Sequence, residues 1–245
     1  MSNKSVLIIS DLHCPYMHPD SLQFLKAVKK KYKPDRVIWI WDELDSHWIS
    51  FHDSDPDLDA AGKELELARK QLWELEKLFP KMDLVESNHW SLLYRRWKVH
   101  WIPRHMLLEY RDVIFWVKRM DGSIKTTRWQ WWNWHDNLTL ELPNWEECYF
   151  VHQAEANIGK HAWHFWMSMV AWHRHSKYWI EYVSSPYNLR FWMVVWCLID
   201  HKSMAFDYNK LQSHRPILWV WLIINWTPQL QPMYLDENWE WNWKL

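Results

Sequence analysis

The sequence predicts an α/β fold that starts on a parallel sheet and continues into mostly antiparallel strands. Short β-branched runs alternate with amphipathic helices through the first 90 of its 245 residues. This order is typical of parallel strands joined by right-handed crossovers. After residue 134 the pattern changes to short strands separated by turn residues. No linker, repeat or low-complexity segment divides the chain, so we expect a single domain over residues 1–245.

The first half contains five predicted elements. The runs 6–10 and 36–40 are short and apolar, as buried parallel strands are. Between them, 19–33 begins with proline and aspartate and ends in lysines, which suits a helix. The clearest helix is 63–79, where apolar residues recur every three or four positions until a proline follows. Residues 82–86 form the third strand.

The second half is expected to be richer in strands. Strands 138–142 and 147–151 flank a Pro-Asn turn signal and predict a hairpin. A helix is expected over 162–171, and region 112–136 has no clear pattern. The remaining predicted strands lie near 179–183, 191–196, 204–208, 217–224 and 231–235.

Charge and hydropathy restrict the function. The chain has 29 basic and 30 acidic residues, which argues against binding duplex nucleic acid by bulk electrostatics. No apolar run reaches about 18 residues and no secretory signal opens the chain, so we expect a cytoplasmic protein without membrane contact. The cysteines (Cys14, Cys148 and Cys197) are scattered, which implies neither a disulfide framework nor a cysteine zinc site.

One feature of the composition is abnormal. The chain has 25 tryptophans and only 3 glycines, where ordinary usage predicts about 17 glycines. Several tryptophans follow asparagine, where Asn-Gly turns are typical. These are Trp145, Trp226, Trp239 and Trp243. We infer that tryptophan stands at many positions suited to glycine.

Polar side chains follow each of the first three strands. Asp11 and His13 follow the first, Asp42 the second, and Asn88 and His89 the third. Because the carboxyl ends of parallel strands meet in one crevice, we expect these side chains to gather there. Ordinary helix caps and turns are the alternative for each residue taken singly.

Further histidines fit the same chemistry. His152 ends the strand 147–151, and the spacing of His173 and His175 places both on one side of an extended segment. Oxygen ligands mixed with imidazole suit Mn, Fe or Zn, and the lack of thiolate argues against a structural zinc site. A buried, hydrogen-bonded histidine is the alternative for His152, since His161 and His164 lie nearby.

The order of these motifs over residues 6–176 resembles the signature of calcineurin-like metallophosphoesterases, in particular small phage or bacterial members. That signature is D-x-H, G-D, G-N-H-[ED], a lone His and G-H-x-H. The matching positions are Asp11-Leu12-His13, Trp41-Asp42, Ser87-Asn88-His89, His152 and Trp172-His173-Arg174-His175. The chain departs from the signature at Trp41, Ser87, Trp90 and Trp172.

The resemblance implies two facing sheets flanked by helices, with a dinuclear metal site on loops at one edge. One ion would bind Asp11, His13 and His175, and the second Asn88, His152 and His173. Asp42 would bridge two divalent ions (Mn, Fe, Zn or Ni). A metal-bridging hydroxide would attack phosphorus, and His89 would protonate the leaving oxygen.

The implied activity is hydrolysis of phosphate esters, with diesters slightly preferred and with nucleotides or nucleic-acid ends among the substrates. Arg95 and Arg96 belong to a basic cluster that could steer such a substrate; an exposed helix face is the equal alternative. Because tryptophan at glycine corners strains the backbone, a catalytically impaired or inactive metal-binding or scaffold protein is the second hypothesis. A tryptophan-rich single-strand nucleic-acid binder is the third.

The acidic residues Asp53, Asp55, Asp57 and Asp59, followed by Glu66, raise a separate possibility. Their spacing approaches that of a calcium-binding loop. The sharp-turn glycine of such a loop is absent, because Ala60 occupies that position. A solvated loop leading into the helix 63–79 is the favoured interpretation.

Overall fold

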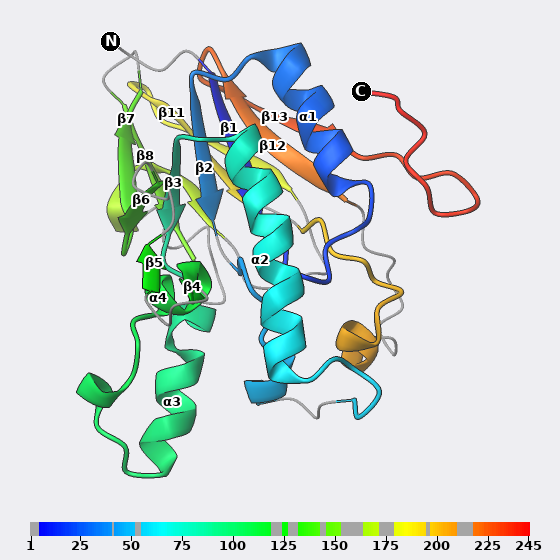
Figure 1. The fold of residues 1–245 in the computed structure, drawn as a ribbon. Coiled ribbons are helices and arrows are strands. Elements are labelled where there is room, and N and C mark those ends of the chain that lie inside the picture. Colours follow the sequence, from blue (N-terminus) through cyan, green and yellow to red (C-terminus); the bar gives the residue numbers. More distant parts are fainter. Residues whose placement is uncertain are drawn as a thin grey trace.

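Figure 1 shows the fold as a computed structural model, which describes residues 5–40, 42–51, 55–118, 124–126, 132–142, 146–152, 164–171, 179–194, 197–209 and 218–245. The strands are β1 (Ser5–Ser10), β2 (Arg36–Ile40), β3 (Met82–Val85), β4 (Trp116–Lys118), β5 (Ile124–Thr126), β6 (Trp132–His135), β7 (Leu138–Glu141), β8 (Glu147–Val151), β9 (Ser168–Ala171), β10 (Ile180–Ser184), β11 (Leu189–Val194), β12 (Trp219–Ile224) and β13 (Thr227–Pro232). The α-helices are α1 (Ser21–Tyr32), α2 (Ala61–Leu78), α3 (Leu92–Val99) and α4 (Tyr110–Phe115). Short 3-10 helices are η1 (His47–Ile49), η2 (Asn88–Ser91), η3 (Arg104–Met106) and η5 (Met204–Asn209).

The larger sheet has the order β13-β12-β1-β2-β3-β6. β1, β2, β3 and β6 run parallel, whereas β12 and β13 are antiparallel. The predicted β1–α1–β2–α2–β3 start is therefore confirmed. β6 comes from the region 112–136, which has no clear sequence pattern, and it pairs along β3.

The smaller sheet has the order β10-β11-β9-β8-β7. The predicted hairpin is confirmed, since β7 and β8 pair antiparallel. Antiparallel pairing of the later strands also holds for β10–β11 and β12–β13, while β9 runs parallel to both its neighbours.

Two sequence predictions are wrong. The expected helix 162–171 contains β9 instead, because a short apolar run that is buried on both sides has no diagnostic period. The expected strand 204–208 is the 3-10 helix η5. Two of its apolar residues, Ala205 and Phe206, reach the core from a turn.

Helices α1 and α2 cover the same face of the larger sheet (Figure 1). The buried face of α2 presents Ala68, Leu72 and Leu75, which are spaced three or four positions apart. Buried residues of both sheets form one hydrophobic cluster that includes Ile8 of β1 and Val170 of β9. The predicted α/β fold of two sheets flanked by helices is thus confirmed.

Tryptophan occupies left-handed backbone at several turns. In the turn between β12 and β13, Asn225 and Trp226 have φ of 46° and 75°, the two positive values of an Asn-Gly hairpin turn. Trp239 and Trp243 have φ of 67° and 62°. These are conformations that glycine favours, as the sequence pattern indicates. Trp41, Trp145 and Trp172 lie outside the described residues.

Among the described residues, no helix is both long and apolar enough to cross a membrane. Cys14, Cys148 and Cys197 are all buried free thiols.

Candidate metal centre

The loops that follow β1 and β2 run side by side. The backbone N–H of His13 donates to the carbonyl of Asp42 at 2.8 Å, and that of Cys14 donates to the carbonyl of Glu43 at 2.8 Å. These bonds continue the parallel pairing beyond the ends of the two strands. They bring together the side chains that the sequence places after separate strands.

Three imidazoles converge on the carboxylate of Asp42. Nε2 of His13 lies 3.6 Å from Oδ2 of Asp42, and Nε2 of His89 lies 3.8 Å from the same oxygen. Nε2 of His152 lies 3.9 Å from the other oxygen, Oδ1. Asp42 and His152 are each only 5 % exposed. One carboxylate thus presents its two oxygens to different histidines, as a bridging ligand would.

Asn88 adds an amide to this cluster. Its backbone N–H donates to Nδ1 of His152 at 3.3 Å. Its side-chain oxygen, Oδ1, is buried and has no hydrogen-bond partner among the residues that the structure describes. A buried acceptor without a partner is costly. A cation would satisfy it, so the donor set of carboxylate, imidazole and amide oxygen fits a divalent metal.

The charge balance of the cluster also fits a metal. Burial, and then the charge of Asp42, raise the pKa of Asp11 well above its ordinary value. Burial alone would lower the pKa of His13, but its hydrogen bond to Asp45 and the charge of Asp42 raise that pKa to about 9. Two carboxylates in one dry site need positive charge beside them.

The backbone of the cluster is strained. Asp11, His13 and Asp42 have φ of 44°, 47° and 38°, in the left-handed region. Each such residue costs about 1–3 kcal/mol, and such residues concentrate where function requires a particular geometry. The strain therefore supports a functional role for these loops.

The remaining predicted ligands, His173 and His175, lie outside the described residues. Of the predicted metal and catalytic residues, the structure brings together Asp11, His13, Asp42, Asn88, His89 and His152.

Arg95 and Arg96 lie on α3 beside Phe51. Their guanidinium carbons are 5.0 Å and 4.2 Å from the centre of the Phe51 ring. Nε of Arg96 also donates to the carbonyl of Ile49 at 2.8 Å. A terminal nitrogen of Arg95 donates to the carbonyl of Asn88 at 3.4 Å, which places Arg95 next to the candidate site. A substrate role for the two arginines stays a prediction.

Two further acidic residues, Glu43 and Asp45, lie in the loop after β2 beside Asp42, and the sequence did not predict a role for them. Oδ1 of Asp45 lies 2.8 Å from Nδ1 of His13. Glu43 accepts hydrogen bonds from Nε1 of Trp90 at 2.9 Å and from the hydroxyl of Tyr110 at 3.2 Å. Burial, the first cause, raises the pKa of Glu43 to about 7. Their position directly after Asp42 was the available signal.

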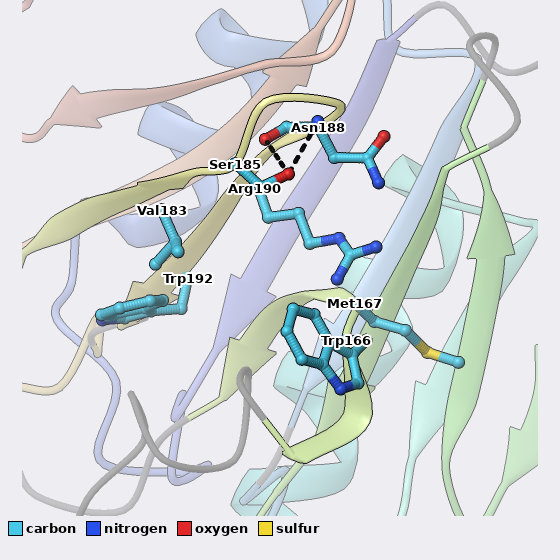
Figure 2. Close-up of a pocket in the computed structure, with 7 residues that line it drawn as sticks. All are labelled: Trp166, Met167, Val183, Ser185, Asn188, Arg190 and Trp192. Atoms are coloured by element: carbon cyan, nitrogen blue, oxygen red, sulfur yellow. Dashed lines mark hydrogen bonds between the residues drawn. The ribbon is translucent and has the colours of Figure 1, made fainter.

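A separate cavity of about 130 Å³ lies on the smaller sheet (Figure 2). Arg190 of β11 reaches across it, with its guanidinium 5.5 Å from the centre of the Trp166 ring. The cavity lies near the amino ends of β9 and β11, whereas His152 follows the carboxyl end of β8. None of the described residues that line it is among Asp11, His13, Asp42, Asn88, His89 and His152.

Comparison with protein-family models finds no match, and neither does comparison with curated protein sequences. Among solved structures, the fold is similar to that of Vps29 from Chaetomium thermophilum, with a TM-score of 0.46 and 10% sequence identity. The alignment covers 99% of this chain and 94% of the other.

Proposed function

We propose that this chain is a metal-dependent phosphoesterase of the metallophosphoesterase type, with diesters slightly preferred over monoesters. The observation that carries the proposal is the convergence of His13, His89 and His152 on the two oxygens of Asp42. The ordered motifs of the sequence, which resemble those of calcineurin-like metallophosphoesterases, support the same conclusion.

The ligands divide into two groups that share Asp42. Asp11 and His13, with His175, would hold one divalent ion, and Asn88 and His152, with His173, the other. When bound, two such ions would supply Lewis-acid activation of water and neutralise charge on the phosphoryl group.

His89 would hold a proton for the leaving oxygen. Its Nδ1 lies 2.7 Å from the carbonyl of Leu44, which can only accept, so Nδ1 carries a hydrogen. The opposite nitrogen, Nε2, faces Asp42 at 3.8 Å. Nε2 is therefore the ring nitrogen from which His89 would donate a proton to the leaving oxygen.

A cavity of about 390 Å³ with aromatic walls supports a nucleotide-like substrate. Trp90 and Ser91 line it, and they directly follow His89 in the sequence. Tyr110 stacks on Trp90 with ring centres 5.8 Å apart. Two arginines (Arg104 and Arg111) and three acidic residues (Glu86, Glu109 and Asp136) also line the cavity. The aromatic walls suit a nucleobase.

The second candidate is a catalytically impaired metal-binding or scaffold protein of the same fold. The observation that favours it is the left-handed backbone at Trp226, Trp239 and Trp243, which weakens the native state. Activity and metal content together separate the two candidates.

The test is a turnover assay with bis-para-nitrophenyl phosphate and the corresponding monoester in the presence of Mn, Ni, Zn or Mg. We expect metal-dependent hydrolysis that Asp42→Asn abolishes and that Asp57→Asn, a change in an exposed loop, leaves intact. Bound metal without turnover would favour the scaffold. Turnover that survives both chelation and Asp42→Asn would contradict the proposal.

A further inference from the structure

A second cluster of ligand-type side chains lies on the far side of His13 from Asp42. It consists of Asp45, His47 and Glu64, and one donor atom of each lies within 4.8 Å of the other two. All three are buried, with exposed fractions of 7 %, 7 % and 2 %. Asp45 and His47 lie after β2, whereas Glu64 lies in the first turn of α2.

Glu64 is held in place from one side. The backbone N–H groups of Ser46 and His47 hydrogen-bond to its carboxylate. Its other oxygen, Oε2, is buried, accepts no hydrogen bond from the described residues, and forms an ion pair with Nδ1 of His47 when that ring is protonated. This oxygen is therefore directed into the cluster.

The hydroxyl of Tyr16 lies 3.1 Å from the same nitrogen of His47. When this hydroxyl donates, Nδ1 carries a lone pair, and that lone pair faces the carboxylate oxygen of Glu64. Two lone pairs in contact repel each other, and either a proton on Nδ1 or a cation bound by both side chains removes that repulsion. The arrangement therefore calls for a cation or a shared proton.

The surroundings of the cluster are acidic. Burial, and then the negative charges of Asp45 and Asp59, raise the pKa of Glu64. On the pKa of His47, burial outweighs the charges of Asp45, Asp59 and Asp55, which act in the same direction as on Glu64. Asp55 and Asp59 belong to the acidic run whose spacing approaches that of a calcium-binding loop. Carboxylates around a buried site raise the local concentration of cations.

We propose that Asp45, His47 and Glu64 bind a divalent transition-metal ion of their own, separate from the Asp42 centre. Two carboxylates and one imidazole, without thiolate, suit Mn or Zn rather than Ca or Mg. Asp45 also joins the two sites, because its Oδ1 hydrogen-bonds to Nδ1 of His13. The ion would hold the loop after β2 against α2.

The direct test uses crystals of the unchanged chain soaked in Mn or Zn. We expect an anomalous peak between the side chains of Asp45, His47 and Glu64. Its absence at saturating concentrations of both ions would overturn the inference, whatever is bound at Asp42.

Metal counting by mass spectrometry gives a second readout in solution. Glu64→Gln is expected to lose one equivalent of Mn, whereas Glu66→Gln, an exposed neighbour on the same helix, is expected to lose none. Asp42→Asn removes the proposed catalytic centre, and one equivalent should remain in that variant. An unchanged count in folded Glu64→Gln would contradict the site, while loss of activity in Asp42→Asn would concern the proposed function alone.

Discussion

Nδ1 of His13 lies 2.8 Å from Oδ1 of Asp45, and both side chains are buried. This hydrogen bond directs the opposite nitrogen, Nε2, toward Asp42 at 3.6 Å. A carboxylate behind a metal-binding histidine selects its tautomer and increases its basicity. Asp45 would therefore position His13 for metal binding in the proposed centre at Asp42.

Asp45→Ala is expected to weaken metal activation by about 10–100-fold, since the orienting carboxylate is lost. Asp45→Asn keeps an acceptor for the Nδ1 hydrogen and should lose less. The measurement is the metal concentration that gives half-maximal hydrolysis for each variant. Equal values for Asp45→Ala and the unchanged chain would show that Asp45 does not position His13.

His89→Ala is expected to lower kcat by about 10²–10⁴-fold, which is the usual contribution of a general acid. Metal content should stay the same, because His89 is proposed to hold a proton and not a metal. Steady-state kinetics and metal analysis of one preparation give both values, and His105→Ala is the exposed control. Loss of a metal equivalent in His89→Ala would instead make His89 a ligand.

Asp83 is expected to stabilise the protein near neutral pH and to lose that effect in acid. Burial would raise its pKa, but hydrogen bonds from Arg36 at 2.7 Å and His135 at 2.9 Å outweigh burial and lower it. A carboxyl with a lowered folded-state pKa stabilises the fold above its ordinary pKa, and the effect disappears as pH falls through the folded value.

Asp83→Asn should therefore cost about 1–3 kcal/mol near pH 7 and less at pH 3. Urea unfolding across this pH range measures the difference, with Asp57→Asn as the exposed control. A cost that is the same at every pH would rule out a contribution from the charge of Asp83.

Trp101→Gly is expected to stabilise the chain. Trp101 is 94 % exposed and has φ of 59°, so the change relieves left-handed strain without removing buried surface. Removing this strain should raise the free energy of unfolding by about 1–2 kcal/mol. The greater conformational freedom of glycine in the unfolded chain lowers that gain by about 0.5–1 kcal/mol.

The matched control is Trp97→Gly in α3, which should cost at least about 1 kcal/mol because glycine disfavours a helix interior. Thermal melts of both variants give the comparison. Destabilisation by Trp101→Gly would count against strain at the tryptophans that occupy left-handed turns.

Local sequence patterns determined many of the secondary structure elements and the approximate place of the candidate site. Alternating β-branched runs and amphipathic helices predicted β1, α1, β2, α2 and β3, because each period reflects one buried face. The same pattern predicted that Asp11, Asp42 and Asn88 would meet, since parallel strands end at one edge. The Asn-Trp pair at Asn225 and Trp226 predicted a turn with positive φ, which the structure has.

Tertiary packing decided the features that the periodicity of the sequence does not indicate. β9 was expected to be helical, and only its place between β8 and β11 makes it a strand. Nothing in the sequence distinguishes Glu64 from exposed acidic residues of the same helix, such as Glu66. Only the packing of α2 brings Glu64 to His47 and Asp45. Sequence patterns report which face of an element is buried, whereas contacts between side chains depend on how whole elements pack together.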